Sequence, residues 1–188
     1  GGNSNAHTCA VTIGGAAKCW GSNSSGRLGD GTSTSRRTPT DVVGLSSGVT
    51  VISAGSAQTC AVHQGAAKCW GAGGNGRLGN GSTSIQYLPV SVSGMNSGVV
   101  EISTGGGHSC ARTSVGAAWC WGQNSSGELG DGTQADRSTP VAVSGLGNGI
   151  ASIQVGYSYT CALSVSGGVQ CWGLNSAGRL GDGTTTKR

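Results

Sequence analysis

One sequence pattern recurs four times along this chain, and it constrains the fold more than any other feature. The copies begin with HTCAV at His7, QTCAV at Gln58, HSCAR at His108 and YTCAL at Tyr159, and each continues into a glycine-rich loop. Their first cysteines are 50 or 51 residues apart. A repeat of this length is typical of a propeller or solenoid, in which each unit buries its apolar face against the next.

Each period carries the pattern of several short strands. In the second copy, the alternating β-branched segment VTVISAG, from Val49, predicts a strand. The segments QTCAVH and AAKCWG predict a hairpin around the two-residue turn Gln64-Gly65. A Gly/Asn-rich loop follows, and then the strand YLPVSVSG, in which Pro89 indicates either an edge position or the start of a strand.

Four strands per period make one propeller blade, so the predicted fold class is all-β. We expect a β-propeller of four-stranded blades, present as a partial ring or as half of an oligomeric ring. The chain reads as a single repeat domain over 1–188, with repeats at about 1–48, 49–98, 99–149 and 150–188.

The loop after each CWG carries the most specific motif. The string C-W-G-x-N-x-x-G-x-L-G-D-G-T occupies 19–32, 120–133 and 171–184, with A-G-x-x-H-[ST]-C-A at strand ends. This pattern resembles the repeat of the regulator of chromosome condensation family over essentially the whole chain, and the resemblance implies a propeller with four-stranded blades. The second copy departs from it, with Gly73 in place of the asparagine and Asn80 in place of the aspartate, which suits a tight turn equally well.

The repeats are incomplete at both ends of this sequence. No VxxISAG-type strand precedes His7, and no TPVxV-type strand follows GDGTTTKR, whereas the resemblance implies more blades than four. Open blade faces tend to pair, which favours self-association into a closed ring of two chains or a head-to-tail filament. A fragment of a longer chain is the alternative, and Gly1 in place of methionine is typical of a processed or excised chain.

Every repeat contains two cysteines on facing strands of its predicted hairpin. Directly opposed residues at a non-hydrogen-bonded site are close enough for a disulfide. The predicted pairs are Cys9 with Cys19, Cys60 with Cys69, Cys110 with Cys120, and Cys161 with Cys171. Four disulfides indicate an oxidising compartment and hence a secreted, extracellular or cell-surface protein.

Two other interpretations of the cysteines stay open. Reduced cysteines act as small core residues in many proteins. Metal binding would recruit His7 and His108 beside the cysteines, but Gln58 and Tyr159 occupy the matching positions of the other repeats. A metal site is therefore disfavoured.

Tryptophan recurs directly after the second cysteine of every repeat, as Trp20, Trp70, Trp121 and Trp172. One tryptophan per repeat at a fixed phase predicts packing between blades in preference to a row of ligand-stacking rings. Trp119 breaks this pattern, since it stands where other repeats have Lys or Gln. We expect it to be exposed, and it is the first candidate for a partner contact.

A second set of partner-contact candidates occupies one equivalent loop position in each repeat. Its members are Arg27, Arg77, Glu128 and Arg179. Because they share a position in the repeat, we expect them to line one rim of the propeller, where three positive charges and one negative charge make a weak field.

Composition and motifs exclude several classes of function. A net charge of +4, with no basic stripe interleaved with aromatic residues, argues against nucleic-acid binding. No segment approaches the ~20 apolar residues of a membrane span. Asp30, Asp131 and Asp182 supply only one carboxylate per loop, too few for calcium, and are better explained as turn caps. No catalytic grouping of histidine with a nucleophile is apparent, so we expect no cofactor and no enzyme.

The leading hypothesis is a non-catalytic extracellular structural or scaffold protein that self-associates through its open propeller ends. The alternative is a secreted propeller module that binds another protein or a glycan. A third hypothesis, implied only by the family resemblance, is a guanine-nucleotide exchange type of regulator.

Overall fold

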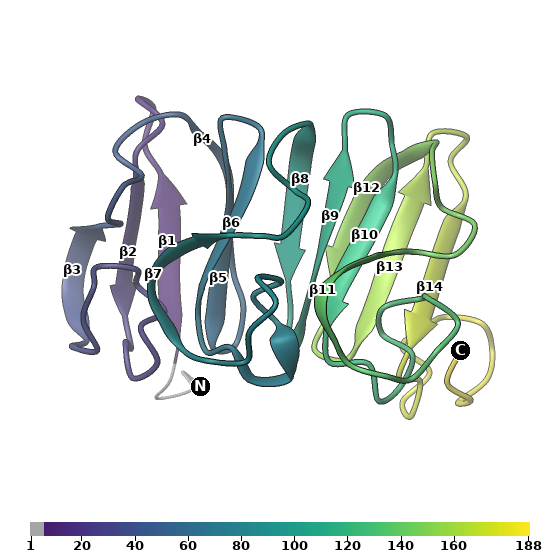
Figure 1. Ribbon diagram of the computed structural model, residues 1–188. Helices are drawn as coiled ribbons and strands as arrows, with labels where there is room; N and C mark the ends of the chain where they lie inside the picture. Colours follow the sequence, from purple (N-terminus) through teal and green to yellow (C-terminus); the bar gives the residue numbers. More distant parts are fainter. Residues whose placement is uncertain (1–5) are drawn as a thin grey trace.

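The computed structural model describes residues 6–188 as a row of four antiparallel sheets, each packed against the next (Figure 1). The first sheet contains β1 (His7–Val11), β2 (Ala17–Gly21) and β3 (Arg36–Asp41). The second contains β4 (Val49–Ala54), β5 (Gln58–His63), β6 (Ala66–Gly71) and β7 (Gln86–Ser91). The third contains β8 (Val99–Thr104), β9 (His108–Thr113), β10 (Ala118–Gly122) and β11 (Arg137–Ala142). The fourth contains β12 (Ile150–Val155), β13 (Tyr159–Ser164) and β14 (Val169–Gly173).

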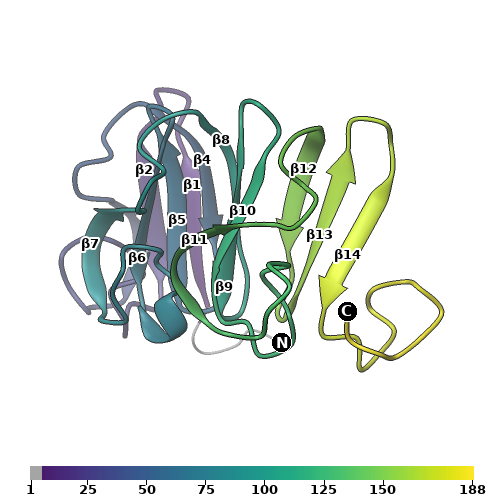
Figure 2. The same ribbon diagram turned by 45° about the vertical axis from the view of Figure 1, so that its right-hand side comes forward.

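The predicted all-β class and the propeller blades are confirmed. The only helical segment between residues 6 and 188 is a single 3-10 turn, η1 (Gly74–Gly76). The row remains an open arc, since the first and last sheets lie at its opposite ends (Figure 2). Among residues 6–188, each end sheet has three strands and each middle sheet has four. The expectation that no strand precedes His7 concerns residues 1–5, which lie outside the described residues.

Each sheet is built around a hairpin that a disulfide closes. In the second sheet Gln64 (φ 51°) and Gly65 (φ 77°) both adopt positive φ, as a two-residue hairpin turn requires. The strand register then places Cys60 directly opposite Cys69, with their Cα atoms 4.1 Å apart. The other three sheets repeat this arrangement, and the four disulfides form at the predicted pairs, Cys9–Cys19, Cys60–Cys69, Cys110–Cys120 and Cys161–Cys171.

The prolines lie in the outermost strands, so of the two alternatives for Pro89 the edge position is correct. Pro39, Pro89 and Pro140 belong to β3, β7 and β11, and each of these strands has a paired neighbour on one side only. A proline lacks the backbone N–H that a second neighbour would require, so it fits this edge and no interior strand.

One backbone carbonyl in each long loop joins neighbouring sheets. The carbonyl of Arg27 accepts hydrogen bonds from Trp70 Nε1 (2.9 Å) and Thr59 Oγ1 (2.7 Å) of the second sheet. The next junction uses Arg77 O with Trp121 and Ser109, and the last uses Glu128 O with Trp172 and Thr160. The interpretation of the tryptophans as contacts between blades is therefore correct for Trp70, Trp121 and Trp172.

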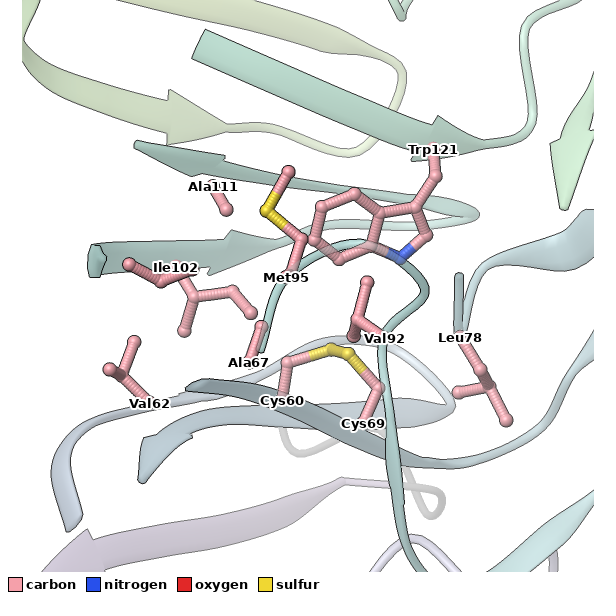
Figure 3. Close-up of a cluster of buried hydrophobic side chains, with 11 residues drawn as sticks. Cys60, Val62, Ala67, Cys69, Leu78, Val92, Met95, Ile102, Ala111 and Trp121 are labelled. Carbon is pink, nitrogen blue, oxygen red and sulfur yellow. A yellow bond between two sulfur atoms is a disulfide. The ribbon is translucent and has the colours of Figure 1, made fainter. Parts of the chain in front are cut away.

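Apolar side chains fill the space around each tryptophan. At the second junction, Trp121 is fully buried against Met95 and Val92 and faces the Cys60–Cys69 disulfide (Figure 3). The alternating strands supply this core from one face of each sheet, which is why the repeats need one another to bury it.

Two histidines form further contacts between sheets. His7 Nε2 lies 2.7 Å from Thr59 Oγ1, and His108 Nε2 lies 2.9 Å from Thr160 Oγ1. Burial lowers the pKa of both histidines from 6.5 to about 4, and the positive charge of Arg27 adds to this effect at His7. Both imidazoles are therefore neutral in the folded protein at neutral pH.

The long loop after the third strand of a blade is held by a buried asparagine. In the first repeat, Asn23 Nδ2 donates to Asp30 Oδ1 (3.1 Å) and its Oδ1 accepts from the Leu28 amide (3.0 Å). Asp30 also accepts from Thr32 and forms an ion pair with Arg36 (2.8 Å). Burial alone would raise the pKa of Asp30, but these hydrogen bonds outweigh it and lower that pKa. The aspartates of this motif thus stabilise turns, as predicted.

The second repeat replaces this set of contacts as a whole. A Cβ atom at Gly73 would collide with the Ser84 carbonyl, so that backbone occupies the space of the missing asparagine side chain. Asn80 accepts from the Ser82 amide at 3.1 Å, and Gln86 stands where the other repeats have the partner arginine. Both members of the ion pair are neutral here, which leaves no unpaired charge.

The tryptophan junction predicts unequal effects of one substitution at two equivalent positions. Trp121→Ala removes a fully buried ring and its bond to Arg77, so we expect a loss of about 3–5 kcal/mol in the free energy of unfolding. Trp20→Ala, at the half-buried equivalent in the first sheet, should cost clearly less. Denaturant unfolding of the dilute protein measures both, and equal losses would contradict this account of the junction.

The neutral histidines predict that acid destabilises the fold above the range where carboxylates titrate. Between pH 6.5 and 4, His7 and His108 are protonated in the unfolded chain but stay neutral in the folded protein. The free energy of unfolding therefore falls as the pH falls through this range. The loss approaches about 3 kcal/mol per histidine. His108→Gln, which copies the residue at Gln58, should roughly halve the fall. Unfolding curves across this pH range provide the measurement, and an unchanged slope in the variant would refute the assignment.

Candidate interaction faces

The contacts that join neighbouring sheets lack partners at the two ends of the row. On the outer side of the first sheet, Thr8 and Ala10 are exposed and Trp20 is half-buried. Their equivalents in the second sheet, Thr59, Ala61 and Trp70, are fully buried against the sheet before them. We call this surface, formed by Thr8, Ala10 and Trp20, the Trp20 face.

The opposite end exposes the other half of a junction. Leu163 and Val169 are 39% and 67% exposed, whereas their equivalents in the second sheet, Val62 and Ala67, are 1% and 0% exposed. Leu180 and the Cys161–Cys171 disulfide are likewise partly exposed, although the matching groups are fully buried in the two middle sheets. We call this surface, formed by Leu163, Val169, Arg179 and Leu180, the Arg179 face.

The two faces carry complementary hydrogen-bonding groups. The Trp20 face presents a threonine hydroxyl and an indole N–H, which are the two donors of an interior junction. The Arg179 face presents the backbone carbonyl that is equivalent to Arg27 O, their common acceptor. None of these three groups has a partner within residues 6–188, and each face supplies what the other lacks.

The structure corrects the expected position of two partner-contact candidates. Arg27 and Glu128 are 4% and 1% exposed, so they lie inside junctions and not on an open rim. Arg27 Nη1 donates to the Ser56 carbonyl of the next sheet at 3.0 Å, and Glu128 Oε2 accepts from the Ser126 amide of its own loop at 2.7 Å. The two loop positions are equivalent, as expected, but the loop turns Arg27 toward the following blade and leaves Glu128 buried against its own loop.

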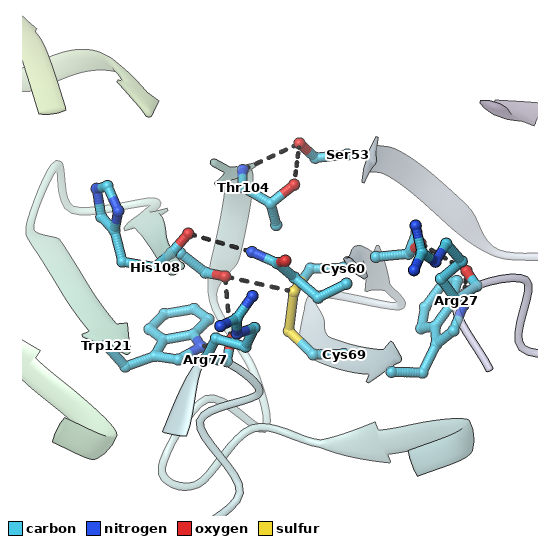
Figure 4. The surroundings of a disulfide bond; sticks show 12 residues. Arg27, Ser53, Cys60, Cys69, Arg77, Thr104, His108 and Trp121 are labelled. Atoms are coloured by element: carbon cyan, nitrogen blue, oxygen red, sulfur yellow. Dashed lines mark hydrogen bonds between the residues drawn. A yellow bond between two sulfur atoms is a disulfide. The ribbon is translucent and has the colours of Figure 1, made fainter. Parts of the chain in front are cut away.

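The other two members of that set differ in their surroundings. Arg77 is half-buried, and its Nη1 donates to the Gly106 carbonyl of the third sheet at 3.1 Å. Figure 4 shows Arg77 and Trp121 on one side of the Cys60–Cys69 disulfide, with Arg27 on the other. Within residues 6–188 no sheet follows Arg179, and its Nε is buried without a hydrogen-bond partner among these residues. A role of Arg77 or Arg179 in partner contact stays a prediction.

Trp119 is half-buried, which corrects the expectation of an exposed ring. It packs against the core at the junction of the second and third sheets. Trp119, Met95 and Pro140 line one small cavity there, so its ring covers the side of the outer strand. A tryptophan fits this polar phase of the strand because the neighbouring proline and methionine give it apolar surroundings.

Sequence reasoning named Arg179 as a contact candidate but missed its apolar neighbours Leu163, Val169 and Leu180, although a signal was present. Val169 stands where the other repeats have Ala17, Ala67 and Ala118, each of which is buried under the linker to the next blade. The larger Val169 in place of alanine therefore marks the repeat in which no linker covers this position. Comparison of repeat positions would have found it.

We also searched the described part of the chain for metal-ligand clusters and for helices that could span a membrane. No group of three or more His, Cys, Asp or Glu side chains that is suited to a metal ion occurs among residues 6–188. Over the same residues, no helix has the length and apolar character needed to span a membrane.

Solved structures with a similar fold include larger propellers. The structure of human WBSCR16 has a TM-score of 0.84 and 24% identity, and the match covers 97% of this chain and 49% of that one. Yeast RCC1 (Prp20), solved bound to Kap60, has a TM-score of 0.81 and 18% identity, with 96% and 45% covered. These likenesses concern the fold, and this chain spans about half the length of each.

Curated relatives match over shorter segments. The zebrafish (Danio rerio) protein RCC2 homolog is 37% identical over 75 residues, which are 39% of this chain and 15% of that protein. The human (Homo sapiens) E3 ubiquitin-protein ligase HERC2 is 39% identical over 77 residues, 40% of this chain and 2% of that protein. This chain therefore covers a small part of either relative.

The sequence pattern described as "Regulator of chromosome condensation (RCC1) repeat" matches residues 19–62, 65–112 and 116–163. A second pattern of the same description matches 4–27, 99–128 and 150–179. The first match begins in β2 and ends in β5, so one sequence repeat crosses a junction between two sheets. With these matches over most of its length, the chain belongs to the regulator of chromosome condensation (RCC1) repeat family.

Proposed function

We propose that this protein is a non-catalytic extracellular binding module whose copies associate head to tail, the Trp20 face of one against the Arg179 face of the next. The single observation that carries the proposal is the complementarity of these faces. Each interior junction unites a threonine or serine hydroxyl, an indole N–H and one carbonyl, and the two faces hold these groups separately.

Apolar contact strengthens this match. Val169 and Leu163 present exposed apolar surface at one end, and Trp20 presents a half-buried ring at the other. Exposed apolar surface beside unpaired polar groups is typical of an interaction site. Because the two surfaces differ, the contact is heterologous and either closes into a ring or continues as a filament.

The four disulfides support an extracellular location. Each closes a hairpin within one sheet, and no free cysteine occurs among residues 6–188. Bonds of this kind persist in an oxidising environment and are rare in the cytosol.

Glycan binding through Trp119 has less support than association of the faces. A glycan-stacking ring needs an open face, and this ring packs on the core beside Pro140. Binding of another protein at the two faces remains compatible with the same chemistry.

Head-to-tail association predicts a mixing experiment. Wild-type protein should grow in apparent mass with concentration in multi-angle light scattering. Trp20→Ala and Val169→Lys each damage one face and should each stay monomeric. An equimolar mixture of the two should stop at a dimer, because it contains one intact face of each kind.

Val115→Ser serves as the control for this experiment. Val115 is 72% exposed in a hairpin loop, outside both faces, so its replacement should leave the assembly unchanged. Circular dichroism confirms folding of each variant. Wild-type protein that stays monomeric at every concentration would overturn self-association.

The oxidised state has a direct chemical test. Alkylation of unfolded, unreduced protein should modify none of the eight cysteines, and alkylation after reduction should modify all of them. Peptide mapping should recover the four intrasheet pairs. Free thiols in the protein isolated from its native source would count against an extracellular location.

A further inference from the structure

The outer edge of β14 has the features of a strand-binding groove. In each of the first three sheets, an alanine of the strand next to the outermost one (β2, β6 or β10) exchanges two backbone hydrogen bonds with the segment that follows the outermost strand. Ala118 O accepts from the Val143 amide (3.0 Å), and the Ala118 amide donates to Leu146 O (3.0 Å). Ala17 and Ala67 make the same two bonds, at 2.8–3.1 Å.

Val169 holds the equivalent position in β14, and its backbone groups have no such partner within residues 6–188. In β13, Leu163 pairs with Val169 two residues along the ladder from the non-hydrogen-bonded Cys161–Cys171 pair, so Leu163 and Val169 also form a non-hydrogen-bonded pair. The alternation of an antiparallel ladder therefore turns the N–H and C=O of Val169 away from β13. The Val169 side chain is 67% exposed, while those of Ala67 and Ala118 are 0% and 1% exposed.

The groove continues a ladder that the chain already begins. Gly173 and Arg188 exchange two backbone hydrogen bonds of 2.9 and 3.2 Å. This rung matches the Gly122–Arg137 pair at the start of β11. Arg188 is anchored by an ion pair with Asp182 (2.9 Å), as Arg137 is by Asp131. A strand placed along β14 would thus extend an existing pairing in a set register.

A cavity of about 360 Å³ marks where a proline would lie. Leu146, Gln170 and Trp172 line it, beside the free edge of β14. At the preceding junction, the equivalents of Leu146 and Gln170 are Met95 and Trp119, and there Pro140 of the outermost strand contacts the same space.

A second subsite fits a valine. At the third sheet, the position of a Cβ on Gly130 lies 2.9 Å from Val143 Cγ1, so this valine packs directly on the glycine. Gly181 is the equivalent residue of the fourth repeat, and no atom lies within 4 Å of its Cβ position. The space beside Gly181 is open where Val42, Val92 and Val143 pack on the equivalent glycines of the other repeats.

We propose that the edge of β14 binds, by strand addition, an extended peptide of the pattern Thr-Pro-Val-x-Val-x-Gly-Leu. The backbone of Val169 supplies affinity, while the cavity and the surface beside Gly181 select the proline and the second valine. Three segments of the chain that approximate this pattern occupy the equivalent grooves: 38–45, 88–95 and 139–146. The groove shares Val169 with the Arg179 face, but it uses the backbone of β14 and not the side-chain contacts on which association of the two faces rests.

A synthetic peptide tests the groove on the intact chain. The probe is STPVAVSGLGNG, the sequence of residues 138–149, capped at both ends. Titration into the Trp20→Ala variant, which we expect to be monomeric, should give saturable 1:1 binding by calorimetry. Hydrogen exchange should show new protection of the Val169 amide, and a scrambled peptide should give neither result.

N-methylation of the probe provides a matched pair. A methyl group on the amide of the residue equivalent to Val143 removes the donor to Val169 O and should weaken binding by about tenfold or more. The amide equivalent to Ala142 points away from β14, so its methylation should change affinity by less than about twofold. Absence of saturable binding, or equal affinity of the two methylated peptides, would overturn the proposal. Either result leaves the light-scattering test of association unaffected.

Discussion

The fold depends on one backbone carbonyl at each of its three junctions that receives two donors from the next sheet. At Arg27 and Arg77 the residue is basic and at Glu128 it is acidic, yet all three carbonyls accept an indole N–H and a hydroxyl. Because the main chain is the acceptor, the side chain at this position is free to vary. The donors are side chains, and accordingly tryptophan occurs at the matching position of every repeat.

Sequence reasoning predicted those features that local geometry determines. A two-residue turn at Gln64-Gly65 sets the register, and the register alone places Cys60 opposite Cys69. Alternation of side chains along the strands predicted the blades, and the proline in β7 predicted its outer edge. The fixed phase of Trp70 and Trp121 predicted their burial between sheets.

The same reasoning failed where the outcome depended on how loops turn. Arg27 and Glu128 occupy equivalent positions in loops rich in Gly, Asn and Ser, a composition that indicates an exposed loop. The loop nevertheless buries both side chains. Trp119 occupies a polar phase of its strand and is nevertheless covered, because Pro140 and Met95 come from segments distant in sequence. Periodicity within one element carries no information about such neighbours, whereas comparison of equivalent repeat positions carries some.

The position of the disulfides makes each sheet more resistant to a pulling force than the junctions between sheets. All four cross-links among residues 6–188 lie within single sheets, and the junctions between sheets are held by hydrogen bonds and apolar contact alone. A pulling force along the row would therefore separate one sheet from the next before any hairpin opens. Each parted sheet would keep its register under tension, so that a stretched chain could recoil into the same contacts when the load is released.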